Sequence, residues 1–243
     1  MGQSWVGAVA ASVDLSPGES KTVRFFLAWH FPNREVTWSQ PGLEDKEITG
    51  LKVGAGYSRK WPDMSSLLAG IEGTSAGLLA ETAAFQAAMY ANSTLPWYLI
   101  DSAAPRGSVL RSGTCFKAAD GRLYGFEGSN ATEGCCPLNC THVWGYEQTL
   151  AKLFPDLERS MRYVDLQEQI APNAIIPSRT IVPLEIRRIW SFWPKYTDIA
   201  PNSQSICTDG EMSTVLKTYR EILVGSSSPL TKDPFFMASW PQC

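Results

Sequence analysis

Residues 120–144 read DGRLYGFEGSNATEGCCPLNCTHVW, a stretch of small, polar and aromatic residues without helical or strand periodicity. The run GRLYGF at residues 121–126 predicts a strand that delivers one carboxylate, Glu127, onto a turn flanked by glycine. A long irregular connection follows, and the sequence THVW at 141–144 is expected to open an amphipathic helix. Polar loops held by rigid elements are where chemistry concentrates. We therefore interpret this stretch as a functional loop; a surface loop with an ordinary glutamate is the alternative.

Composition excludes several classes of function. The chain has 243 residues, 44% of them hydrophobic and 11% aromatic, enough to bury a core in one large or two ordinary domains. The net charge of -3 arises from interspersed signs, which argues against a nucleic-acid partner. No run of 18 apolar residues and no signal peptide is visible in the sequence. We expect a cytoplasmic or otherwise soluble protein without stable membrane insertion.

Six cysteines are too sparse for a disulfide scaffold in a chain of this length, so reduced thiols are expected. Cys135, Cys136, Cys140 and His142 resemble a ligand cluster. Their spacing lacks the Cys-x-x-Cys knuckle in which two thiolates face one zinc ion. The sequence therefore predicts small buried thiols rather than a metal site, and no cofactor.

The first part of the chain predicts β-structure. Apolar runs at residues 6–15 and 22–31 flank the turn signal SPGES at 16–20, which favours a β-hairpin within residues 4–31. A lone hairpin is not stable, so the chain is expected to begin inside a β-domain whose earlier strands are missing. Residues 31–63 are rich in proline and glycine, as domain connections are, and place a boundary near Trp61.

Helical periodicity dominates the remainder. Apolar residues recur every three and four positions over 64–92, and a proline-containing start signal predicts a second helix over 94–113, which closes an αα-hairpin. The helical spacing returns between Trp144 and Val164, where Pro155 should break the helix. A last helix is expected with Asp209 near its N-terminus, where an acid suits the helix dipole.

Between these helices lies an aperiodic, proline-rich stretch over residues 172–207. Its aromatic side chains suit either a wall that stacks on sugars or a lid packed on the core. They are Trp190, Phe192, Trp193 and Tyr196.

Five blocks of the sequence carry a resemblance to a known family. They are DLSPGESKTVRFFLAWHFPNR at 14–34, STLPWYL at 93–99, TCFKAADGRLYGFEG at 114–128, GCCPLNCTHVWGYEQTLAKLFPDLERSMR at 134–162, and DGEMSTVLKTYRE at 209–221. In this order they resemble glycoside hydrolase family 116, the group of bacterial β-glucosidases and the animal non-lysosomal glucosylceramidase (bile acid β-glucosidase). The chain looks like a prokaryotic-type member.

The resemblance implies an N-terminal β-sandwich followed by an (α/α)6 barrel, and retaining hydrolysis of β-linked glucosides without a cofactor. Residues 1–62 would be the end of the sandwich and its linker, and residues 63–243 the first, truncated part of the barrel. Residues 65–243 should then form an incomplete ring of antiparallel helix pairs, with Glu127 and His142 at the same end. The whole would be a fragment, inactive by itself.

The resemblance also implies the site. Glu127 occupies the position of the family's nucleophile, and the acid/base, an aspartate, would lie beyond Cys243. The implied substrate-binding residues are Thr141, His142, Ser178, Arg179 and Asp209. His142 and Ser178 differ from the aspartate and histidine of the animal members, which leaves the sugar specificity open.

Alternatives remain at several of these positions. His142 could instead be a helix-start residue satisfied by backbone, and Arg179 could be an ion-pair partner of Glu185 or Asp209. Glu133 and Glu147 are rivals of Glu127 as nucleophile. For the whole chain, the alternative to an enzyme is a carbohydrate-binding or structural α-toroid without catalysis.

Overall fold

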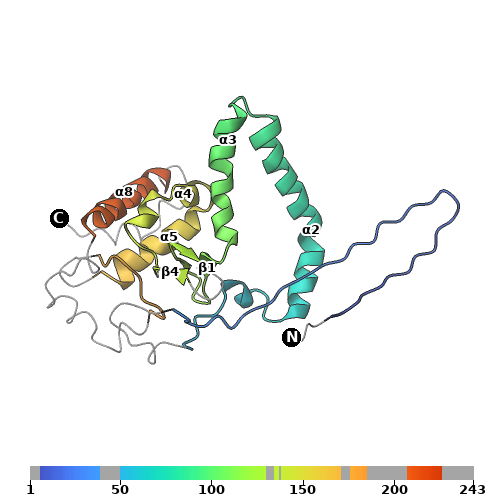
Figure 1. Ribbon diagram of the computed structural model, residues 1–243, viewed down its shortest axis with the longest axis horizontal. Helices are drawn as coiled ribbons and strands as arrows, with labels where there is room; N and C mark the ends of the chain where they lie inside the picture. Colours follow the sequence, from blue (N-terminus) through green and yellow to red (C-terminus); the bar gives the residue numbers. More distant parts are fainter. Residues whose placement is uncertain are drawn as a thin grey trace, which may run out of the picture.

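The computed structural model describes residues 6–38, 50–129, 134–136, 138–170, 176–184 and 207–225. Within them lie several helices and four short antiparallel strands (Figure 1). Glu133, Glu185 and the four aromatic residues predicted to form a sugar-stacking wall or a lid lie outside the described residues.

The N-terminal segment is an extended arm that runs out from the body and returns (Figure 1). A turn reverses it at the predicted place: the Glu19 amide donates to the Ser16 carbonyl at 2.9 Å, and Gly18 has φ of 81°. The prediction of a β-hairpin is wrong, because no strand pairing joins the two sides of the turn over residues 6–31. Val6 and Leu27 are 91% and 86% exposed, so no neighbouring surface supports the two sides, and an isolated hairpin is marginal in water.

The two helices predicted to form an αα-hairpin are present and are joined by a short turn, but they splay apart from it rather than packing along their length (Figure 1). Helix α2 spans Met64–Gln86 and continues through a π turn at Ala87–Ala91, and α3 spans Trp97–Ala103 and continues as a 3-10 helix over Ala104–Arg111. Asp63 begins α2 with a capping box: its side chain accepts the Ser66 amide at 2.7 Å. Pro96 directly precedes α3, as the start signal predicts.

Two small hairpins follow. Strand β1 (Cys115–Lys117) pairs with β2 (Leu123–Gly125), with Phe116 opposite Tyr124. Strand β3 (Gly128–Ser129) pairs with β4 (Gly134–Cys135). The predicted strand at 121–126 is therefore confirmed at Leu123–Gly125.

The helices of the second half pack against this β-structure. A 3-10 turn at Val143–Tyr146 stands where an amphipathic helix was expected to open, and α4 (Thr149–Leu153) follows it. Pro155 interrupts the helix as predicted and starts α5 (Pro155–Tyr163), which ends in a π turn at Val164–Glu168. Helix α8 (Thr208–Gly225) packs on α5, and Asp209 lies in its first turn, as expected (Figure 1).

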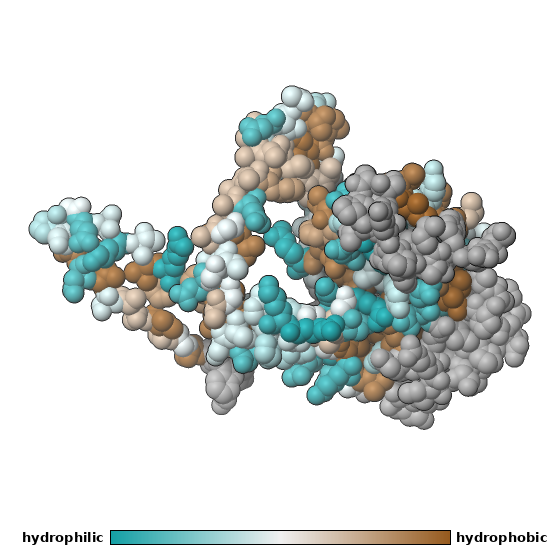
Figure 2. Space-filling view, turned by 180° about the vertical axis from the view of Figure 1, so that it is seen from behind, coloured by the Kyte–Doolittle hydropathy of each residue, from teal (hydrophilic) through white to brown (hydrophobic). Residues whose placement is uncertain are grey.

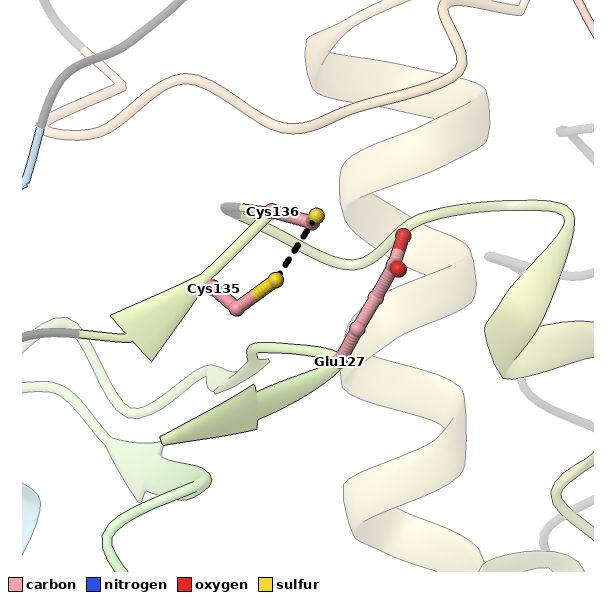
Figure 3. Close-up of side chains that lie close together, drawn as sticks. All are labelled: Glu127, Cys135 and Cys136. Carbon is pink, nitrogen blue, oxygen red and sulfur yellow. Dashed lines mark hydrogen bonds between the residues drawn. The ribbon is translucent and has the colours of Figure 1, made fainter. Parts of the chain in front are cut away.

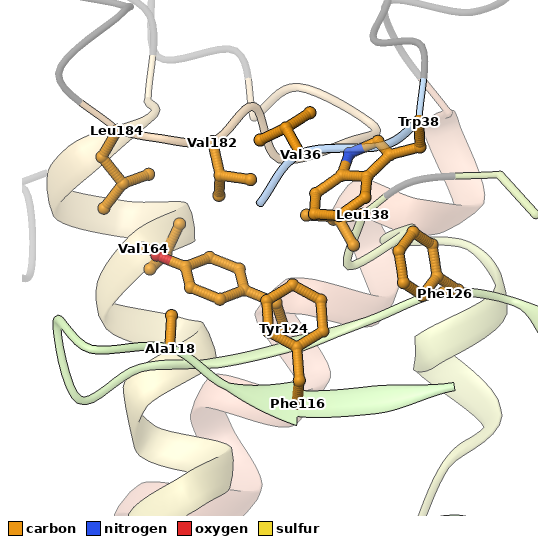
Figure 4. Packing of buried hydrophobic residues seen from close by; sticks show 10 residues of the cluster. All are labelled: Val36, Trp38, Phe116, Ala118, Tyr124, Phe126, Leu138, Val164, Val182 and Leu184. Carbon is orange, nitrogen blue, oxygen red and sulfur yellow. The ribbon is translucent and has the colours of Figure 1, made fainter. Parts of the chain in front are cut away.

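A hydrophobic core joins Val36 and Trp38, which follow the arm, to the β-structure (Figure 4). Trp38 packs edge-on against Phe126, with ring centroids 5.1 Å apart, and also contacts Phe116. The core consists of Val36, Trp38, Phe116, Ala118, Tyr124, Phe126, Leu138, Val164, Val182 and Leu184. Residues on both sides of the boundary predicted near residue 62 thus share one core, which holds the strand that leads to Glu127.

Hydrophobic side chains also lie on the surface of the α2–α3 pair and along the arm (Figure 2). Leu79 and Trp97 are among the exposed residues of the pair. In the described part of the chain, no helix combines the length and the apolar character that crossing a lipid bilayer requires.

Candidate active site

Glu127 lies where one hairpin passes into the next, between β2 and β3 and next to Phe126. The Phe126 amide donates to the Thr114 carbonyl at 2.8 Å, and the Glu127 amide donates to the Cys135 carbonyl at 3.1 Å. The backbone on both sides of the carboxylate is therefore fixed by strand pairing, and the Glu127 side chain remains 23% exposed. Glu127 is thus not buried in an apolar helix interface.

Asn139 anchors β2 from the loop side, which the sequence did not indicate. Its amide N–H donates to the Gly125 carbonyl at 2.8 Å, and its side-chain oxygen accepts the Gly125 amide at the same distance. Its side-chain nitrogen donates to the Leu123 carbonyl at 3.4 Å. The residue has a φ of 49°, in the left-handed region that asparagine tolerates better than most residues. Asn139 therefore positions the strand that carries Glu127.

The absence of a side chain at Gly125 allows Trp144 to pack directly against β2. A Cβ atom at Gly125 would lie 2.0 Å from the Trp144 ring, so the strand approaches the indole more closely than any side chain allows. The turn after the functional loop is thereby held against β2.

Arg179 forms an ion pair with Glu127, with Nη2 at 3.0 Å from Oε1. Its Nη1 donates to the Cys136 carbonyl at 2.7 Å, so the guanidinium bridges the carboxylate and the loop backbone. The alternative pairing of Arg179 with Asp209 is wrong, because Asp209 pairs with His142.

The surroundings of Glu127 favour its charged form. Burial alone would raise the pKa of Glu127, but hydrogen bonds from Cys140 and Arg179, the charge of Arg179 and a hydrogen bond from Cys136 together lower it. A carboxylate that attacks carbon must be ionised, so this environment suits a nucleophile.

Three thiols surround the carboxylate. The sulfur atoms of Cys135 and Cys136 lie 2.9 Å apart, and Cys135, Cys136 and Cys140 are all free (Figure 3). The hydrogen bond with Cys135 and burial raise the pKa of Cys136 to about 11, and burial raises that of Cys140. The four residues that resemble a ligand cluster are thus divided: the two vicinal thiols face Glu127, whereas His142 turns to Asp209. The prediction of buried thiols is confirmed for Cys140 and is wrong for Cys135, which is exposed.

His142 and Asp209 form a second polar group. Nε2 of His142 lies 3.2 Å from Oδ2 of Asp209, and both side chains are substantially exposed. They border a cavity of about 410 Å³. Its lining comprises His142, Gly145, Tyr146, Gln148, Asp209, Met212, Ser213, Leu216, Lys217 and Arg220. Glu127 is not part of this lining.

Thr141 and Ser178 connect the two groups. The Thr141 amide donates to the Ser178 carbonyl at 2.9 Å, and both residues are buried. Cys140, which contacts Glu127, precedes His142 by two positions, so the Glu127 carboxylate and the His142 backbone lie within roughly 15 Å of each other. The structure therefore brings the predicted residues into two adjoining groups.

Glu147 has a structural role that occupies its carboxylate. Its oxygens accept the amides of Thr149 at 2.7 Å and Leu150 at 3.0 Å at the start of α4. Helix caps of this kind stabilise the free first-turn amides. This disfavours Glu147 as a rival of Glu127.

A buried ionic network joins α5 to α8 and includes two residues of the cavity lining, Lys217 and Arg220. Glu158, fully buried, accepts Nη2 of Arg220 at 2.8 Å and Nζ of Lys217 at 3.3 Å. Nζ of Lys217 also donates to the Trp144 carbonyl at 3.0 Å, which holds the turn after the functional loop. No sequence motif pointed to this network, because its members lie on two helices far apart in the chain.

Comparison with known proteins supports the resemblance. Residues 1–69 match the family model described as beta-glucosidase 2, glycosyl-hydrolase family 116 N-term. No curated protein matches the chain. The match confirms the likeness to glycoside hydrolase family 116 in the N-terminal part of the chain. Glu127 and its neighbours lie outside the matched residues.

Proposed function

We propose that this chain is part of a retaining β-glycosidase that acts on β-linked glucosides, with Glu127 as the nucleophile. The proposal rests mainly on the environment of Glu127. Its carboxylate is partly exposed, its backbone is fixed by strand pairing, and Arg179 at 3.0 Å helps to keep it ionised. The family match over residues 1–69 supports the class of reaction.

In this proposal the Glu127 carboxylate attacks the anomeric carbon, and the bond to the leaving oxygen breaks. A glycosyl ester forms, and water then hydrolyses it with retention. The ester carries no charge, so Arg179 loses its ion-pair partner during the first step and regains it in the second. The resemblance places the acid/base, an aspartate, after Cys243, and a retaining enzyme needs it about 5 Å from Glu127.

The sugar hydroxyls would meet the polar groups beside Glu127. His142 and Asp209 are exposed at the rim of the 410 Å³ cavity, a volume within the usual range for small-ligand sites. Arg179 can donate to a hydroxyl once the ester has formed. Thr141 and Ser178 are buried, so we assign them the role of holding the loop rather than touching the sugar.

We also propose the two-domain architecture that the family resemblance implies. Residues 1–62 would end a β-sandwich, and residues 63–243 would begin an (α/α)6 barrel. The αα-hairpin of α2 and α3 and the packing of α5 on α8 support it.

Trapping tests the nucleophile directly. A 2-deoxy-2-fluoro-β-glucoside with a dinitrophenolate leaving group needs no general acid, so the 243-residue chain itself can be used. We expect mass spectrometry of peptides to find the fluoroglucosyl group on Glu127. Glu127→Gln should abolish labelling, whereas Glu133→Gln should retain it. A label on Glu133 or Glu147 would show that the chemistry belongs to another carboxylate.

Rescue by azide tests the same assignment in a polypeptide that includes the acid/base. Glu127→Gly should abolish turnover of aryl β-glucosides, and azide should restore it as the α-glycosyl azide, because the anion attacks from the vacated face. If glucosides bind to the chain but label no carboxylate, the non-catalytic carbohydrate-binding module is the better description.

A further inference from the structure

Two thiols and one carboxylate converge beside the proposed nucleophile (Figure 3). Sγ of Cys135, Sγ of Cys136 and a carboxylate oxygen of Glu127 all lie within 4.8 Å of one another. Cys135 ends β4, Cys136 follows it, and Glu127 lies across the pair of strands, bonded through its amide to the Cys135 carbonyl. The donor atoms therefore come from backbone that strand pairing already fixes.

The separations of these atoms fit a metal ion with thiolate ligands. Zinc lies about 2.3 Å from thiolate sulfur and about 2.0–2.2 Å from carboxylate oxygen, so a tetrahedral site holds its donors about 3.5–3.8 Å apart. The two sulfur atoms, 2.9 Å apart, must separate by less than about 1 Å, and the sulfur-to-oxygen separations, at most 4.8 Å, must close by no more than about 1.3 Å. Side-chain rotation at the exposed Cys135 provides this movement.

The charges also fit. Two thiolates and the Glu127 carboxylate carry three negative charges, and Arg179 at 3.0 Å supplies one positive charge. A divalent cation makes the group neutral. Thiolate ligands favour soft and borderline cations over magnesium or calcium.

We propose that Cys135, Cys136 and Glu127 form a binding site for a thiophilic divalent cation of the zinc and cadmium class, with the fourth position open to solvent. This is a different set from the cysteine and histidine cluster that the spacing argument considered, because Glu127 replaces Cys140 and His142. Binding releases the two thiol protons and takes the Glu127 carboxylate as a ligand. The bound cation therefore inhibits the glycosidase. This inhibition rests on the proposed function, whereas the binding of the cation does not.

Cadmium titration of the full reduced chain tests the site, with the ultraviolet sulfur-to-cadmium charge-transfer absorption as the signal. We expect one cadmium ion per chain. Cys135→Ser should weaken binding at least about tenfold, since even residues that only support metal ligands cost that much. Cys207→Ser removes a thiol outside the group and should leave the affinity unchanged. Absence of the absorption, or an unchanged affinity in Cys135→Ser, would overturn the proposal.

Inhibition is measured separately. Cadmium should slow the labelling of Glu127 by the activated fluoroglucoside in the wild type and less so in Cys135→Ser. If Glu127 is never labelled, even without cadmium, the proposed function fails while the titration still decides the metal site. If cadmium binds at the thiols without slowing the labelling, Glu127 is not one of its ligands and the three-residue site is refuted.

Discussion

At Glu127 the charge state is set by one guanidinium and two thiols rather than by exposure. Arg179 reaches it from a segment 52 positions later in the chain (179 minus 127), after the functional loop and α5. The side chain that keeps Glu127 ionised also holds the loop backbone through the Cys136 carbonyl.

Arg179→Gln should raise the pKa of Glu127, because both the hydrogen bond and the positive charge that lower it are lost. The acid limb of the pH profile for labelling by the activated fluoroglucoside should therefore move to higher pH. Arg106→Gln, at an exposed position on the helical hairpin, is the matched control. An identical acid limb in Arg179→Gln and the wild type would contradict this electrostatic role.

Asn139→Ala should lower the free energy of unfolding by about 1–3 kcal/mol, because the Gly125 amide and Leu123 carbonyl lose buried hydrogen-bond partners. Asn139→Asp retains the acceptor for Gly125 but buries a charge and sets an oxygen against the Leu123 carbonyl, so it should lose at least as much. Urea denaturation measures both, with Asn92→Ala at an exposed position as the control. Equal stability of Asn139→Ala and the control would show that β2 does not depend on this anchor.

At the scale of elements, charged side chains form the contact between α5 and α8, whereas most contacts between helices are apolar. Burial raises the pKa of Glu221 to about 8, and burial together with Arg162 lowers that of Lys217 to about 8. Both groups thus lie far from their ordinary values of 4.5 and 10.5. The interface is therefore sensitive to pH on both sides of neutrality.

The free energy of unfolding should fall as the pH rises from about 4.5 towards 8, because folded Glu221 retains a proton that the unfolded chain has lost. It should rise again from about 8 towards 10.5, where unfolded Lys217 still binds a proton that the folded form has released. Glu221→Gln should remove the falling limb, on the order of a few kcal/mol. Urea denaturation across this pH range checks it, with Glu72→Gln as an exposed control. A falling limb that persists in Glu221→Gln would assign it to other groups.

The helices were more predictable than the strands and the site, for physical reasons. Helix α2 has a local start signal at Asp63, and α5 has one at Pro155, so sequence neighbours determine where they begin. The arm fails as a hairpin because strand pairing depends on surfaces supplied by other segments. Glu127 was predicted from the resemblance, but the pairing with Arg179 and the anchor Asn139 were not, since a loop asparagine and a distant arginine carry no local pattern.

At the scale of the molecule, the arm and the body differ in how they are held. Residues 6–31 expose most of their hydrophobic side chains, whereas Val36 and Trp38 are buried in the core shared with the strands. Within a few residues, the chain therefore passes from an arm that packs on no core to a segment that is buried in one.

Limited proteolysis with trypsin should cut first after Lys21 or Arg24, which lie on the exposed arm. Arg122 and Arg162 are held by ion pairs in the body and should be cut later. Mass spectrometry of early time points identifies the sites, and replacing Lys21 and Arg24 by glutamine should delay the first cut. A first cut within residues 115–165 would contradict this difference.

The anchoring of β2 by Asn139 has a consequence for how the chain can be produced. Asn139, Cys140 and Thr141 form an Asn-x-Thr acceptor for N-linked glycans, and the Asn139 side chain is 3% exposed and bonded on both its atoms. A glycan added to the nascent chain would be attached to the side-chain nitrogen that faces the Leu123 carbonyl and would not fit in the interior. A secretory eukaryotic host that modifies this asparagine would thus yield a chain in which the strand before Glu127 cannot form, whereas a bacterial host leaves the anchor intact.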